Sequence, residues 1–315
     1  WPVRIALAVL WGLGLTALRS TGLPGVPSAF WPLCGAIFMF RAIVYLYDAR
    51  FAKAPPGLLQ FLGYFYLLPN LYFLLFPVVD HQTYLVSRQR RPIEECAQTG
   101  VRWIARGVLQ LVLYRIVDAW RPDPATATGV ASVAAYAVLT YLLYLRVSGQ
   151  FHVAIGMLRL YGLDLPETHR RYLLASSVAD FWRRINIYWK DFILKLFYLP
   201  VFFRLRRSGE ARAAAIATVV AFAATWVLHS YQWYWLVGAP LLSWPDTLFW
   251  AILGAVMVHA TVRETTARGR RPQPTPLRRA AGIAGTFAFI VLLWSLWNAP
   301  SVEAWIHLLS LRGGV

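Results

Sequence analysis

Four apolar stretches constrain the fold more than any other feature, because each approaches or reaches the roughly 20 residues that a helix needs to cross a bilayer. They cover residues 130–145, 213–238, 241–262 and 282–297. Inside a bilayer, a helix satisfies its backbone hydrogen bonds within one segment. The sequence therefore predicts an all-α, polytopic integral membrane protein.

The other apolar stretches include 58–79, a further candidate for a membrane span that is uncharged throughout, and several that are shorter or carry charges. They cover residues 3–18, 31–47, 58–79, 103–117 and 152–161. Pro69 and Asn70 interrupt one of them, which predicts a helix break facing protein or a wet cavity. The stretch 103–117 is crossed by arginines and is typical of an interfacial helix. The whole pattern predicts roughly eight to ten membrane-inserted helices in a single domain that covers residues 1–315.

Charge is strongly unbalanced: the net charge is +17, although only 14% of the residues are charged. Basic residues gather in short loops between apolar stretches, above all at 204–212 and 263–279. Cytoplasmic loops facing anionic lipid explain this pattern better than binding of nucleic acid does. With both loops in the cytoplasm, His229 would lie on the order of 25 Å along an unbroken helix from Arg212, toward the outer face.

The stretch 180–200 combines charges with large aromatic residues. At helical spacing, one stripe contains Phe181, Ile185, Tyr188 and Phe192, and its neighbour contains Trp182, Asn186, Trp189 and Ile193. Such a composition suits a helix that lies at a bilayer face. We therefore expect one helix that floors a cavity, with the Asn186 amide in an otherwise apolar stripe.

His229 is the main candidate for chemistry within an apolar stretch, and Ser230 and Gln232 are its nearest polar neighbours in sequence. An ionisable side chain inside a membrane costs free energy unless partners or water compensate it, so it indicates a functional site. Burial would keep the imidazole neutral at pH 7, as a general base requires. The alternative is a neutral histidine hydrogen-bonded between two helices.

The remaining polar residues give weaker signals. His81 and His169 fall between apolar stretches and are expected on the solvated surface, whereas His152 begins an apolar segment and is a candidate for a cavity wall. The aspartates near predicted loops favour helix caps and turns over paired acid and base groups; they are Asp118, Asp164 and Asp246. No histidine or cysteine spacing is typical of a metal site, and no glycine-rich loop is typical of a nucleotide site. No metal and no bound cofactor is expected.

Four segments carry residue patterns that occur together in one family. Phe-Trp-Arg-Arg-Ile-Asn at 181–186, followed by Tyr-Leu-Pro at 198–200, aligns without a gap to Phe-Trp-Arg-Arg-Trp-His ending in Tyr-Ile-Pro. Ser-Gly-Gln-Phe-His-Val-Ala-Ile-Gly at 148–156 is similar to Ser-Gly-Tyr-Ser-Asp-Ile-Ala-Ile-Gly. Leu-Asp-Leu-Pro-Glu at 163–167 is similar to the end of Gly-Ile-x-Leu-Pro-Glu, and Phe-Arg-Ala-Ile-Val-Tyr-Leu-Tyr-Asp at 40–48 resembles Phe-Gln-x-Ile-Ser-Tyr-x-Ile-Asp. Over about residues 38–240, the chain thus resembles the membrane-bound O-acyltransferases, in particular the bacterial alginate O-acetylases and teichoic-acid D-alanyl transfer proteins.

This resemblance implies a tunnel through a helical membrane domain, with a catalytic pair. The family's invariant histidine maps onto His229, and its second polar position, His in the bacterial branch and Asn in many eukaryotic members, maps onto Asn186. The further tunnel candidates are Trp182, Arg183, Trp189, His152, Gln232 and Ser230, although the aromatic and basic ones also suit a role as interfacial anchors. The chain departs from the family pattern at Ile185 and Leu228, where the family has Trp, at Leu194 and Lys195, where it has an Arg-Asp pair, and at His152, where it often has Asp.

The implied reaction moves an acetyl or other short acyl group from acyl-CoA or another acyl thioester, the co-substrate, to a hydroxyl of an extracytoplasmic glycan. That reaction belongs to cell-envelope polysaccharide modification at the bacterial inner membrane, and relatives there often work with a second, exported transferase. Membrane lipids are the other expected partners. The alternatives are a lipid or lysolipid acceptor, and a scaffold or transporter that kept the fold without the chemistry.

Overall fold

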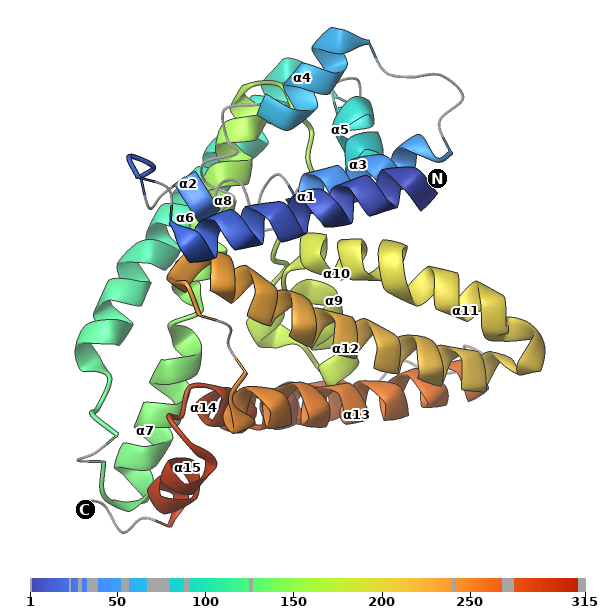
Figure 1. Ribbon diagram of the computed structural model, residues 1–315. Helices are drawn as coiled ribbons and strands as arrows, with labels where there is room; N and C mark the ends of the chain where they lie inside the picture. The colour runs from blue at the N-terminus through green and yellow to red at the C-terminus, as the bar shows by residue number, and fades with distance from the viewer. Residues whose placement is uncertain are drawn as a thin grey trace. The chain divides into compact units, whose positions relative to one another are not determined.

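The computed structural model describes residues 2–22, 24–27, 30–32, 39–51, 57–66, 80–87, 91–124, 127–239, 242–267 and 275–310 (Figure 1). Every regular element in these ranges is helical, so the predicted all-α class is confirmed. The predicted break at Pro69 and Asn70 lies outside the described residues.

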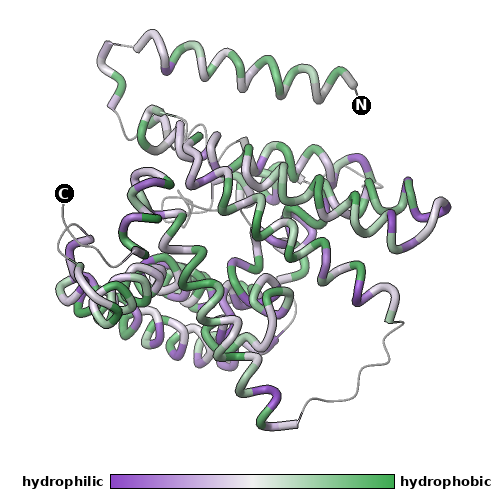
Figure 2. The backbone as a smooth tube through the Cα atoms, turned by 90° about the horizontal axis from the view of Figure 1, so that it is seen from below, coloured by the Kyte–Doolittle hydropathy of each residue, from purple (hydrophilic) through white to green (hydrophobic). Residues whose placement is uncertain are grey.

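Four described segments are long and apolar enough to cross a membrane. They are α7 (Gly129–Leu142) together with α8 (Leu145–Leu160), then α12 (Glu210–Val237), α13 (Trp244–Thr266) and α14 (Pro276–Trp297). The last three coincide with the predicted stretches 213–238, 241–262 and 282–297, whereas the first covers 130–145 and continues through most of 152–161. The larger number of membrane-inserted helices stays a prediction, as does insertion of α1 (Pro2–Thr21), which Figure 2 shows apolar along most of its length beside the N-terminal label.

The chain divides into two compact units, and the first comprises Trp1–Ile104, Val153–Glu167 and Leu228–Leu241. Besides α1 it contains α2 (Phe30–Pro32), α3 (Met39–Ala49), α4 (Leu58–Tyr66), α5 (His81–Ser87) and the start of α6 (Ile93–Trp120). The buried Arg41 donates to the carbonyls of Tyr64 and Phe65, both at 2.8 Å, and so satisfies acceptors at the carboxyl end of α4. His81 is buried against the rings of Tyr45 and Tyr64 and not on the surface, so its predicted position was wrong.

A buried ion pair closes the segment after α8 in this unit. Arg159 Nη2 lies 2.6 Å from Asp164 Oδ1, and the guanidinium also donates to the Leu165 carbonyl and stands 4.4 Å from the centre of the Trp103 ring. Arg91 reaches the other Asp164 oxygen at 3.3 Å. Asp164 therefore holds the turn against the helix that precedes it, as its position near a predicted loop suggested.

The second unit comprises Ala105–His152, Thr168–Val227 and Leu242–Val315. Its shorter helices are α9 (Val178–Arg184), α10 (Ile187–Ile193), α11 (Leu199–Leu205) and α15 (Val302–Leu309), with a 3₁₀ turn at Tyr172–Leu174, a second at Arg206–Ser208 and a π-helical segment at Leu194–Tyr198. In its core α14 packs on α7 and on α13, and Phe249 stacks on Trp297 at 4.5 Å between ring centres.

A buried carboxylate fixes the start of α13 in this unit. Ser243 caps the helix by accepting from the Asp246 N–H at 3.2 Å. The two Asp246 carboxylate oxygens accept from the indoles of Trp226 at 2.8 Å and Trp297 at 2.7 Å. Since a buried carboxylate must be hydrogen-bonded to be tolerated, these tryptophans join three helices at one point.

Candidate functional site

The expected single helix over residues 180–200 is broken at Ile185 and Asn186. Helix α9 ends at Arg184 and α10 begins at Ile187. Asn186 adopts the left-handed conformation, with φ 42° and ψ 58°, and its side chain accepts from the Trp189 N–H at 3.3 Å. Asn tolerates this conformation and is a favoured N-cap, so the amide that stood out in an apolar stripe starts a new helix.

A loop that precedes these helices holds the break in place. The Thr168 carbonyl accepts from the Ile187 N–H, and the Arg170 N–H donates to the Arg184 carbonyl, both at 2.8 Å. These two bonds pair the backbone on both sides of Asn186 with the two neighbours of His169. The conformation at Asn186 is therefore imposed by a segment 16 to 18 residues earlier as well as by its own side chain.

His169, which that loop carries, is buried in a cluster of polar and aromatic side chains. Its Nε2 lies 3.0 Å from the Tyr144 hydroxyl and its Nδ1 lies 3.1 Å from Thr168 Oγ1. Its ring stacks on Phe151 at 5.6 Å, and its centre lies 6.1 Å from that of His152. The expectation of a solvated surface histidine was wrong, because His169 is only 1% exposed.

Burial decides the charge of this cluster. Desolvation, with a contribution from His152, lowers the pKa of His169 well below its usual range, so the imidazole is neutral at pH 7. Desolvation also raises the pKa of Tyr172 to about 12, and the Tyr172 hydroxyl lies 3.2 Å from Ser148 Oγ. The His169 imidazole and the Tyr172 hydroxyl are therefore uncharged hydrogen-bonding groups at neutral pH.

His152 has a defined tautomer in this arrangement. Its Nδ1 lies 2.7 Å from Gln110 Oε1, and an amide oxygen can only accept. Nδ1 therefore carries the proton, and in the neutral ring Nε2 holds the lone pair. The side chain is 2% exposed, as expected for a cavity wall or a packed core.

The aromatic and basic tunnel candidates flank the break. Trp189 is buried and packs 5.8 Å from Phe192, whereas Trp182 is half-buried and lies 4.7 Å from the Phe222 ring. Arg183 is exposed and forms an ion pair with Glu264 at 3.2 Å. Arg183 thus links α9 to the end of α13, and Trp189 supports the first turn that Asn186 caps.

The remaining candidates lie on α12 in the first unit. His229 is half-buried, and Ser230 and Gln232 are buried. Asn186, Trp182, Arg183, Trp189 and His152 belong to the second unit. The pairing of His229 with Asn186 therefore joins residues of two compact units and stays a prediction.

The structure adds four residues to the site that the sequence did not single out: Gln110, Tyr144, His169 and Tyr172. One signal was available, because Tyr144, Ser148 and His152 recur at intervals of four residues, which places them on one face of a helix. The contact of His169 with this face depends on a loop that returns to it, and no local spacing predicts that return.

In the described part of the chain, no three His, Cys, Asp or Glu side chains gather in a group that could hold a metal ion. No protein-family model matches the chain, and no curated protein is significantly similar to it. The function must therefore be argued from the residues themselves.

Proposed function

We propose that the chain is a membrane-embedded O-acyltransferase that moves a short acyl group from an acyl thioester to a hydroxyl of an extracytoplasmic glycan. Its co-substrate would be acyl-CoA or a similar thioester. Two findings support a membrane setting for this chemistry: four helices long and apolar enough to cross a bilayer, and their exposed apolar side chains. The residue patterns at 148–156 and 181–186 support the reaction class.

The observation that carries the proposal is the helix break at Asn186. The break falls at the position that the resemblance assigns to the second catalytic polar residue. Because the Asn186 side-chain oxygen accepts from the Trp189 N–H, the amide NH₂ group is the part of this side chain that can donate to another molecule. A donor held by a rigid helix start suits stabilisation of a developing oxyanion.

In the proposed reaction, the acceptor hydroxyl oxygen attacks the thioester carbonyl carbon. His229 takes the hydroxyl proton as the new C–O bond forms, and Asn186 donates to the carbonyl oxygen as negative charge develops there. Breakage of the C–S bond releases the thiolate, which takes the proton from the imidazolium of His229. A positioned general base contributes roughly 10² to 10⁴-fold to such a reaction.

The test is release of free thiol and transfer of label from radioactive acetyl-CoA to soluble oligosaccharide acceptors by purified protein in nanodiscs. We expect His229→Ala and His229→Gln to abolish transfer, while His307→Ala, which changes an exposed histidine on α15, keeps it. Wild-type transfer by both His229 variants would refute the mechanism. A scaffold or transporter would be favoured if neither the unaltered protein nor any variant consumes the thioester and the His229→Gln variant still folds and inserts into the membrane.

The variant Asn186→Gly distinguishes a catalytic role of the Asn186 amide from its role as the N-cap of α10. Glycine accepts the left-handed conformation and replaces an Asn cap at a cost of only a few tenths of a kcal/mol, so this variant should fold. We expect its transfer rate to fall by about 10²-fold if the amide stabilises the oxyanion. Full activity would leave Asn186 with a structural role alone.

A lipid or lysolipid acceptor is the second candidate. It is favoured by the identity of Asn186, which matches the eukaryotic pattern and not the bacterial histidine. Transfer of labelled acyl groups to lysophospholipids in preference to oligosaccharides, in the same assay, would decide for it.

A further inference from the structure

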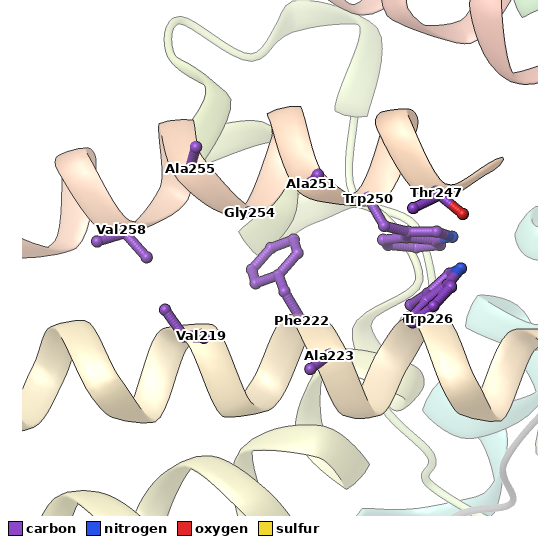
Figure 3. Close-up of a pocket in the computed structure, with 10 residues that line it drawn as sticks. All are labelled: Val219, Phe222, Ala223, Trp226, Thr247, Trp250, Ala251, Gly254, Ala255 and Val258. Atoms are coloured by element: carbon purple, nitrogen blue, oxygen red, sulfur yellow. The ribbon is translucent and has the colours of Figure 1, made fainter. Parts of the chain in front are cut away.

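A groove of about 390 Å³ opens between the helices α12 and α13. Figure 3 shows the two helices side by side, with the Phe222 ring between them. The rims carry small, exposed side chains, namely Ala223 on α12 and Ala251 and Ala255 on α13. The groove is therefore open to its surroundings and apolar along its length.

The floor of the groove is held rigidly. Phe222 and Trp250 are buried, and the Phe222 ring rests on Trp182 at 4.7 Å. A Cβ atom at Gly254 would stand 3.3 Å from Phe222 Cβ, so glycine lets the ring lie close to α13. These contacts hold the Phe222 ring in place between the two helices (Figure 3).

The dimensions of the groove suit one hydrocarbon chain. Its lining extends from Thr247 to Val258 on α13, which at 1.5 Å per residue is about 16 Å along the helix axis. Half of the roughly 30 Å hydrocarbon core of a bilayer is of the same length. Both helices are apolar enough to cross that core, and the groove lies near the middle of each helix, so lipid tails would lie against it.

The two ends of the groove differ in charge. At one end lie Trp226 and Trp250, as Figure 3 shows. Beyond the other end, marked by Val219 and Val258, α12 begins and α13 ends, and both Arg212 and Arg263 are exposed there. Arg212 precedes Val219 by two helical turns and is therefore on the same face of α12.

The acidic residues at this end do not cancel its positive charge. Glu264 is offset by its ion pair with Arg183 at 3.2 Å, and Glu210 lies at the amino end of α12, where a carboxylate is favourable. Further arginines stand in the preceding turn, at Arg206 and Arg207. An anionic group at the end of an apolar groove is the chemistry that this surface complements.

We propose that the groove binds one acyl chain of an anionic glycerophospholipid, with the lipid phosphate held by Arg212. The site does not depend on the acyl-transfer reaction. The basic end argues for a lipid in preference to a second copy of the chain, because a copy would present further basic residues to Arg212 and Arg263.

Native mass spectrometry of delipidated protein, titrated with phosphatidylglycerol and with phosphatidylcholine, tests the site. We expect one phosphatidylglycerol to bind more tightly than the others, and Ala223→Phe and Ala255→Phe, which fill the groove, to weaken that binding about tenfold. Ala288→Phe places the same ring at an exposed alanine of α14 and should change nothing. Arg212→Gln should remove the preference for the anionic lipid, whereas Arg279→Gln, at the start of α14, should keep it.

Wild-type lipid binding by both groove-filling variants would overturn the proposal, as would an equal loss in Ala288→Phe. Dimers that Ala223→Phe dissociates, without any change in lipid adducts, would assign the groove to a second copy. If the phenylalanine variants do not fold, Ala223→Cys gives an independent measurement. Phosphatidylglycerol should slow its alkylation by a maleimide, read at the peptide that contains residue 223, and unchanged alkylation would count against the site.

Discussion

His169, which the sequence predicts to be a solvated surface residue, is buried and has a structural role. Its imidazole joins Tyr144 to Thr168, and the backbone on either side of it holds the helix break at Asn186. Loss of this ring would therefore affect the candidate catalytic amide through the loop, with no direct contact required. Positioning and stability are linked at this one side chain.

We predict that stability falls as the pH drops below about 6.5, and that His169 accounts for part of the fall. Burial lowers the pKa of His169 in the folded chain, while the unfolded chain keeps the ordinary value, so the unfolded state binds more protons below that pH. The contribution of neutral His169 to the free energy of unfolding is fully present above the pKa of His169 in the unfolded chain. It is lost as the pH falls toward the pKa of His169 in the folded chain, by up to about 1.4 kcal/mol per pH unit.

Thermal unfolding in detergent between pH 7.5 and pH 5, followed by tryptophan fluorescence, measures this effect. His169→Gln removes the titrating ring but keeps hydrogen-bonding groups, so its unfolding midpoint should change less steeply with pH than that of the unaltered chain. His307→Ala, which removes an exposed histidine, should leave the slope unchanged. Parallel profiles for all three chains would show that His169 is not the group responsible.

At the scale of elements, α6 and α8 meet through pairs of glycines. In the first unit, a Cβ atom at Gly156 would stand 2.7 Å from the Gly100 carbonyl oxygen. In the second unit, a Cβ atom at Gly149 would stand 2.9 Å from the Gly107 carbonyl oxygen. On each helix the two glycines are seven residues apart, or about two turns, so they lie on one face. Contact of two helix backbones requires such small residues.

Gly149→Ala is predicted to lower the unfolding midpoint, because its methyl group would meet the α6 backbone and Leu111 Cγ at 3.0 Å. The expected cost is about 1–3 kcal/mol, as for other overpacked sites. Gly285→Ala on α14 is the matched control, since nothing lies within 4 Å of its new Cβ atom. It should raise stability by about 0.5–1 kcal/mol through helix propensity. Equal effects of the two substitutions would show that the contact between α6 and α8 at Gly149 leaves room for a methyl group.

The long apolar helices could be predicted from the sequence, whereas features that depend on contacts between distant segments could not. Uninterrupted apolar stretches predicted α12, α13 and α14, because length and composition alone determine whether a helix can cross a bilayer. The break at Asn186 could not be predicted from helical spacing, since its two supporting hydrogen bonds come from residues 168 and 170. Burial of His169 against Tyr144 likewise depends on contacts between segments 25 residues apart.

At the scale of the whole molecule, the distribution of arginines predicts orientation. The loops around 204–212 and 263–279 flank α12 and α13, and the positive-inside rule places both loops in the cytoplasm. Residues near the start of α13 would then face the opposite side of the membrane. The same orientation places the basic end of the groove at the cytoplasmic leaflet, where anionic lipids are concentrated.

Single cysteines at the two ends of α13 test this orientation directly. Leu242 and Thr266 are exposed and stand just before the helix and at its last residue. In a chain with Cys34→Ser and Cys96→Ser, an impermeant maleimide added to intact cells should label Leu242→Cys, and should label Thr266→Cys only after the membrane is permeabilised. The opposite pattern would reverse the orientation and place the arginines of the groove outside. Labelling of both residues from outside would mean that α13 does not cross the membrane, and the proposed lipid site would then lose its basis.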